Sequence, residues 1–103
     1  MNKVKILEAK ILRGEILKIL YNERPRGLKE SILKRSLVGD YTNIEIEKEL
    51  AYLADRRKAY IYRDDGDTSD ETDAIIEISR FGIDLIEGTQ APDPGIAFRE
   101  EGV

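Results

Sequence analysis

Histidine and cysteine are both missing from the sequence. The commonest general base, the commonest zinc ligand and any thiolate nucleophile are therefore unavailable. The serines also lack the histidine that usually activates a hydroxyl nucleophile. Carboxylates, in contrast, are concentrated in the stretch DDGDTSDETD, residues 64–73, where six of ten residues are acidic. This composition leaves carboxylate catalysis, a calcium site or recognition of a partner by charge.

Catalysis and calcium binding are the weaker of these interpretations. A loop exposed to water neither raises a carboxyl pKa nor excludes solvent from a reaction. An EF-hand loop has glycine at position 6 and glutamate at position 12, and this stretch does not have that spacing. We therefore predict a protein that is not an enzyme and needs no metal and no cofactor.

Charge is distributed unevenly along the 103 residues, whose formal net charge is −4. Residues 1–40 contain ten basic and five acidic side chains, whereas residues 64–103 contain two basic and twelve acidic ones. Such a division indicates two surfaces with different partners, or the basic half of one molecule meeting the acidic half of another. The remaining alternative is surface charge that segregated without consequence. No apolar run reaches the ~20 residues that span a membrane, and the start lacks a signal-peptide core. We expect one domain in the cytoplasm and no membrane partner.

The first element that must position these charges is a helix over residues 3–22, ended by Pro25 and Gly27. It contains nine large aliphatic residues between positions 4 and 20, more than one buried stripe needs. The excess predicts a homodimer through this helix. The expected interface residues are Val4, Leu7 and Ile11.

Two further helices follow. Residues 28–37 repeat the helical spacing, and Gly39 is expected to form a left-handed cap. Thr42 and Glu45 fit a capping box that starts a third helix, which should run to about Arg57. Three side chains of these helices are expected in the core, namely Ile32, Leu50 and Leu53.

The remaining elements are shorter. Residues 59–63 and 74–79 are rich in isoleucine and tyrosine and predict two strands joined by the acidic stretch. Residues 81–87 return to helical spacing, and Gly88 should end that helix. We expect one domain over residues 1–88. Residues 89–103 are expected to form an extended tail with one apolar spot at residues 96–98.

This order of elements, and the stretches TNIEIEKELAYLADRRKAYIYR and IIEISRFGIDLIEG, resemble the winged helix-turn-helix of small bacterial and phage regulators. The ending GIDLIEGT…DPGIA looks similar to ArsR-type regulators of Mu-like prophages. The resemblance implies a mainly α fold with a two-stranded β-hairpin wing. One departure is that Lys58 or Ala59 stands where these families often have glycine. A residue other than glycine must then adopt the left-handed turn, or the helix must end differently.

The resemblance implies double-stranded DNA as the partner, with the third helix in the major groove. Basic side chains would contact phosphates, and Asn43 could reach a base edge. The candidate DNA-binding residues are Lys29, Lys34, Arg35, Asn43, Lys48, Tyr52 and Arg56. Against this function, Glu45, Glu47 and Glu49 lie on the same helix, and the wing is acidic.

The alternative is a winged-helix adaptor that binds a protein and not DNA. Its support is the apolar character of the outer face of the third helix, which includes Ile44, Ala51 and Tyr52. The acidic wing, from Asp64 to Asp73, would then face a basic protein partner. If the protein binds DNA, the same acids oppose binding, because two like charges ~4 Å apart in water repel by about 1 kcal/mol.

Overall fold

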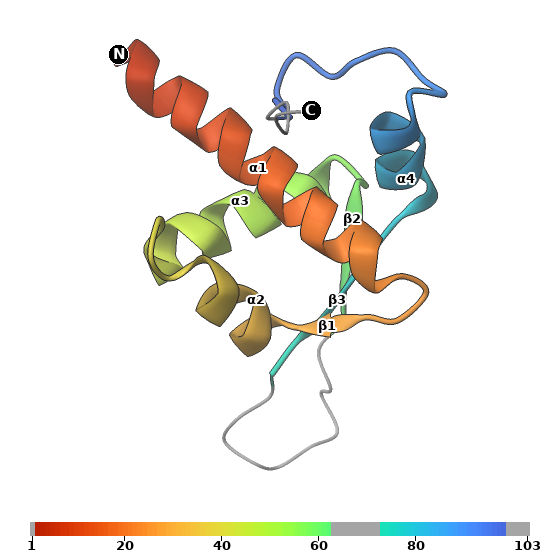
Figure 1. Ribbon diagram of the computed structural model, residues 1–103, viewed down its shortest axis with the longest axis horizontal. Coiled ribbons are helices and arrows are strands. Elements are labelled where there is room, and N and C mark those ends of the chain that lie inside the picture. The colour runs from red at the N-terminus through yellow and green to blue at the C-terminus, as the bar shows by residue number, and fades with distance from the viewer. Residues whose placement is uncertain (1, 63–72, 99–103) are drawn as a thin grey trace.

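The computed structural model describes residues 2–62 and 73–98, which form four helices around a small sheet (Figure 1). The elements are α1 (Lys3–Glu23), β1 (Leu28–Lys29), α2 (Glu30–Leu37), α3 (Asn43–Asp55), β2 (Ala59–Tyr62), β3 (Ile75–Ile78) and α4 (Arg80–Glu87). The predicted fold class, mainly α with a β-hairpin wing, is confirmed. Within the described ranges, no helix has both the length and the apolar composition needed to cross a bilayer.

The sheet has three strands in the order β1–β3–β2, and both pairings are antiparallel. The prediction that a helix begins at residue 28 was wrong, because Leu28 pairs with Ile76 at the edge of β3. Gly27 allows this approach: a Cβ there would lie 2.3 Å from the Ile75 side chain. The expected two-stranded wing therefore has a third, two-residue strand.

The core lies where α1 packs against α3, β3 and α4. The predicted burial of Leu50 and Leu53 is confirmed. The prediction that Ile32 is core was wrong, since its side chain is 47% exposed. The helix starts at Glu30 rather than at residue 28, and Leu33 and Leu37 form its buried side.

The three helix ends singled out by sequence differ in outcome. α3 ends at Asp55, and Arg57, two residues later, lies in the left-handed region at φ 61°, so a non-glycine residue does adopt this turn. The Ser79 hydroxyl donates a hydrogen bond to the Arg57 carbonyl and so supports the turn. Gly39 does not form a left-handed cap, because α2 ends at Val38 in right-handed helical geometry. Gly88, with φ 76°, caps α4 as expected.

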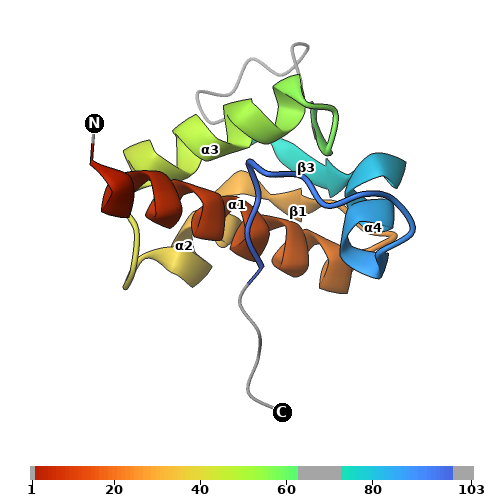
Figure 2. The same ribbon diagram turned by 90° about the horizontal axis from the view of Figure 1, so that it is seen from above.

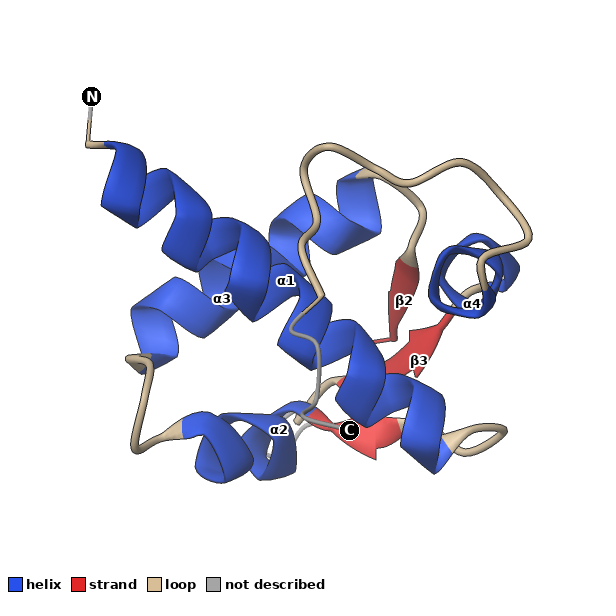
Figure 3. Cartoon of the chain, turned by 45° about the horizontal axis from the view of Figure 1, so that its top comes forward, coloured by secondary structure: helices blue, strands red, loops and turns tan. Residues whose placement is uncertain are grey.

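After α4, residues 89–98 return across α1 (Figures 2 and 3). The Ala97 amide donates a hydrogen bond to the Lys10 carbonyl at 3.1 Å. Ile96, part of the predicted apolar spot, is buried in the core. Gly14 makes room for this crossing, because a Cβ at that position would lie 2.0 Å from the Ala97 carbonyl oxygen.

The first two turns of α1 form the exposed end of the helix (Figures 1 and 3). Val4 and Leu7 are 61% and 54% exposed, and Ile11 is half-buried. The second half of the helix supplies the core through Leu12 and Leu20. The aliphatic residues of α1 therefore divide between a buried half and an exposed apolar end.

Candidate nucleic-acid interface

The start of α3 is fixed by its cap. The Thr42 hydroxyl accepts a hydrogen bond from the Glu45 amide at 3.2 Å, and the Thr42 amide donates to the Glu45 carboxylate at 2.9 Å. This is the predicted capping box, and it is confirmed. The hydrogen bonds from the Thr42 amide and hydroxyl lower the pKa of the Glu45 carboxyl. The carboxylate of Glu45 is therefore held at the helix terminus, where a negative charge stabilises the helix.

Beyond the cap, α3 has one buried and one exposed face. Ile46, Leu50 and Leu53 point into the core. The exposed face begins with Asn43 and Ile44 and continues along the helix with Glu47, Lys48 and Ala51. Thirteen residues at about 1.5 Å per residue make a helix of roughly 20 Å, long enough to cross a major groove.

Lys34 makes two ion pairs, one within α2 and one that joins α2 to this face of α3. Its ammonium nitrogen lies 2.8 Å from a Glu30 carboxylate oxygen and 2.6 Å from one of Glu47. The hydrogen bonds to Glu30 and Glu47 raise the pKa of the Lys34 amine. Lys34 thus forms an ion pair with Glu47 across the two helices. Its own positive charge is already neutralised by the carboxylates of Glu30 and Glu47.

Tyr52 lies on the side of α3 that faces α1. The Arg13 guanidinium carbon stacks 3.6 Å from the centre of the Tyr52 ring, and that of Arg56 lies 4.9 Å away. Arg13 also donates to Glu49 at 2.7 Å and to the Gly95 carbonyl at 2.8 Å. A Cβ on Gly95 would lie 2.0 Å from the Tyr52 hydroxyl oxygen, so the ring packs closely against the returning chain.

The structure brings only some of the seven predicted DNA-binding residues together. Lys34, Arg35 and Asn43 line one hollow between α2 and α3, together with Val38. Lys48 lines a different hollow, shared with Lys5 of α1.

The other three predicted DNA-binding residues line neither of these two hollows. Lys29 is exposed on β1, and Arg56 is exposed at the far end of α3. Tyr52 is half-buried against Arg13. The candidate interface is therefore an exposed strip along α3, with basic side chains at separate points.

Two features of this region had no sequence prediction. Val38 is 67% exposed at the end of α2 and lines one hollow with Asn43 and Ile44. Arg13 and Glu49 form a largely buried ion pair between α1 and α3. A local pattern gives no sign of the pair, because its partners are 36 residues apart.

The acidic stretch is described only at its last residue, Asp73, and the rest of it lies outside the described residues. The Ser31 amide donates to one Asp73 oxygen at 3.0 Å, and the Ser31 hydroxyl donates to the other at 2.5 Å. These hydrogen bonds, led by that from the hydroxyl, lower the pKa of the Asp73 carboxyl. Asp73 therefore ties the start of β3 to the first turn of α2.

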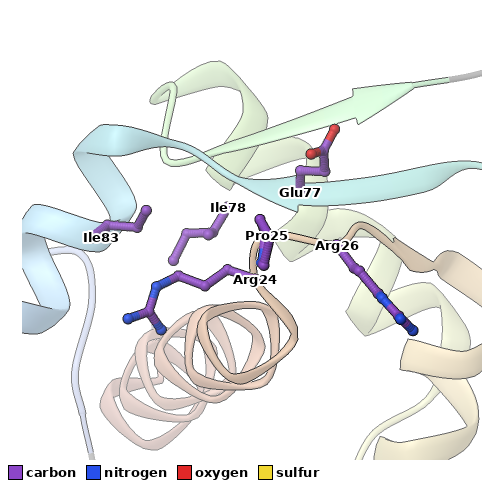
Figure 4. Close-up of a pocket in the computed structure, with 6 residues that line it drawn as sticks. All are labelled: Arg24, Pro25, Arg26, Glu77, Ile78 and Ile83. Atoms are coloured by element: carbon purple, nitrogen blue, oxygen red, sulfur yellow. The ribbon is translucent and has the colours of Figure 1, made fainter.

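Another hollow, of about 520 Å³, lies beside the turn after α1 (Figure 4). Arg24 and Arg26 extend from the turn in opposite directions, so their charges do not converge on one ligand. Arg24 also donates to the Tyr21 carbonyl at 2.8 Å and stacks on the Tyr21 ring. We do not regard this hollow as the functional site.

The helices, the antiparallel sheet and the exposed α3 define a winged-helix fold. No protein-family model matches the sequence, and no curated protein matches it. Among solved structures, the chain is similar to several of MepR from S. aureus, all of them mutants. One, bound to an oligodeoxyribonucleotide, is 26% identical with a TM-score of 0.62, over 74% of this chain and 51% of that one.

The second MepR mutant comes from a multidrug-resistant clinical isolate of S. aureus. It is also 26% identical, with a TM-score of 0.63, over 82% of this chain and 58% of that one. This chain thus matches only a little over half the length of either MepR structure.

Proposed function

We propose that this protein is a DNA-binding transcriptional regulator of winged-helix type and that α3 enters the major groove. The observation that carries the proposal is the likeness to MepR bound to an oligodeoxyribonucleotide. It is supported by the exposed face of α3, which starts at a capped N-terminus and is free of the core. In helix-turn-helix proteins, this part of the second helix contacts the base edges.

The phosphate contacts of this proposal fall to the exposed cations. Lys29, Arg35, Lys48 and Arg56 are exposed and can neutralise phosphates. Lys34 must leave Glu30 and Glu47 before it can do so, and its net contribution is therefore smaller. Tyr52 contributes indirectly, because its ring lies beside Arg56 at the end of α3.

We also propose that the regulator is a homodimer through α1. Val4 and Leu7 are the exposed apolar side chains that support this contact, with Ile11 at its edge. Sedimentation at tens of micromolar should give about twice the chain mass of 11.8 kDa. Leu7→Lys should restore the monomer, because an unpaired charge in an apolar interface is costly. A wild-type monomer would refute the dimer.

Three further proposals rest on the sequence. The ending GIDLIEGT supports a prophage origin of ArsR type. The acids of residues 64–73 support a basic protein partner for the wing. A DNA-binding regulator of this kind would act in the cytoplasm.

The test is binding of a fluorescent random duplex, followed by anisotropy. Lys48→Ala should weaken binding to all duplexes by a similar factor and reduce the salt slope by about one. Arg24→Ala is the matched control: it removes the same charge at the other end of the fold, beside Glu87, and should change little. If the wild type ignores duplex DNA at low salt, the regulator is refuted and the adaptor is favoured.

A further inference from the structure

Ile44 is an apolar side chain in an unusual place. It is 78% exposed, the largest fraction among the large hydrophobic residues that the structure describes. The other isoleucine of α3, Ile46, is completely buried. An exposed isoleucine at the start of α3 therefore adds nothing to the core and is free to contact whatever approaches that end of the helix.

The position of Ile44 is the one from which a recognition helix reads bases. It is the second residue of α3, and the N-terminal residues of such a helix contact base edges. Helical side chains lean toward the N-terminus, so Ile44 leans toward the end that leads into the groove. Its neighbours there are Asn43 and Val38, which line the same hollow.

The other side chains of this first turn have different tasks. Thr42 and Glu45 are bound to each other in the capping box. Glu47, one turn later, is held by Lys34 at 2.6 Å. Asn43 and Ile44 are then the first-turn residues best placed to meet a base edge.

The major-groove edge of DNA presents an apolar group at one base only, the C5 methyl of thymine. Apolar side chains contact that methyl, and burying a CH₂-sized group away from water favours binding. We propose that Ile44 determines specificity by packing on a thymine methyl in the operator. This inference rests on the proposed function, since it requires α3 to lie in the major groove.

The test isolates the methyl group. Wild-type protein is used to select duplexes from a randomised pool at low salt, and the recovered site is made again with deoxyuridine at one thymine position at a time. Deoxyuridine pairs as thymidine does and lacks only the C5 methyl. At one position, the substitution should weaken wild-type binding about fourfold, equivalent to ~0.8 kcal/mol at 1.4 kcal/mol per tenfold.

Ile44→Ala should bind the thymine site about as weakly as wild type binds the uracil site, and it should no longer distinguish the two. Phe81→Ala is the matched control, because it removes another exposed apolar side chain, on α4, and should keep the wild-type preference. Sensitivity to the methyl that survives in Ile44→Ala would overturn the inference. So would a wild type that binds the thymine and uracil sites equally at every position.

The two failures are distinguishable. A protein that binds duplex DNA without a methyl preference loses only the role given to Ile44. A protein that recovers no duplex at low salt loses the proposed function, and the role of Ile44 with it. In that case, the exposed Ile44 and Val38 would belong to a protein-docking surface.

Discussion

Gly14→Ala sets two effects of opposite sign against each other. In an isolated helix, alanine is more favourable than glycine by about 1 kcal/mol. In this fold, the new Cβ would lie 2.0 Å from the Ala97 carbonyl oxygen and 2.9 Å from its carbon. These are backbone atoms of the segment that crosses α1, so the segment must move as a unit.

The size of the loss follows from what the displaced segment gives up. The Ala97–Lys10 and Arg13–Gly95 hydrogen bonds contribute about 1 kcal/mol each. Burial of Ile96 contributes roughly another 1.5–3 kcal/mol. After about 1 kcal/mol of helix propensity is subtracted, Gly14→Ala should lower the free energy of unfolding by about 2.5–4 kcal/mol. A domain of this size has some 5–15 kcal/mol in total.

Thermal unfolding followed by circular dichroism measures this effect, and a fall in Tm of about 10 °C or more is expected. Gly39→Ala is the matched control: its φ is ordinary, and a Cβ there would meet no described atom within 4 Å. Its Tm should stay near that of the wild type. A Gly14→Ala protein that is more stable than wild type would show that the segment does not cross α1 at Gly14.

Two more predictions concern the core and the cap. Leu53→Ala removes a fully buried side chain and should lower the free energy of unfolding, measured with denaturant, by about 2–5 kcal/mol. Ile32→Ala changes an exposed site and should cost well under half of that. Equal costs would contradict the packing of α2. The lowered pKa values of Glu45 and Asp73 imply stability that is present above their usual values of 4.5 and 3.8 and is lost as pH falls through the lower folded values. When Tm is measured at a series of pH values from 7 downward, it should therefore start to decrease once the pH is lower than about 4. Thr42→Val, which removes the hydroxyl bonded to Glu45, should make that fall shallower, and an unchanged profile would contradict the role of the cap.

The parts of the fold that depend on local patterns could be predicted from sequence. The apolar spacing of α1 and α3 and the capping box at Thr42 involve residues within one or two helical turns of each other. Because no glycine follows α3, the sequence indicated that a non-glycine residue would adopt the left-handed turn there or that the helix would end differently. It did not identify Arg57 as that residue.

The parts of the fold that depend on contacts between residues far apart in the chain could not be predicted from the sequence. β1 is two residues long and exists because the edge of β3 accepts it, so the residues before α2 gave no strand pattern. With this strand in place, α2 starts only at Glu30, and its buried side is formed by Leu33 and Leu37, while Ile32 is exposed. In sequence, Gly14 is a weak point of a helix, and only the crossing of Ala97 gives it a role.

In the candidate site too, local contacts could be predicted from the sequence, whereas contacts between helices could not. The pairing of Lys34 with Glu30 follows the i, i+4 rule and was within reach of the sequence. Its second partner, Glu47, comes from α3 and depends on how the two helices pack. Tyr52 was expected on the outer face of α3, and its contact with Arg13 of α1 required the structure.

The salt dependence of binding to random duplex DNA tests the central proposal most directly. Exposed cations at Lys29, Arg35, Lys48 and Arg56 would neutralise about four phosphates per chain. The proposed dimer would neutralise about eight, which predicts a slope of about −7 in log affinity against log salt. Between about 50 and about 200 mM salt, the affinity should then fall roughly 10,000-fold. An affinity that stays constant over this range, or no binding at the lowest salt, would contradict a protein that places α3 against DNA.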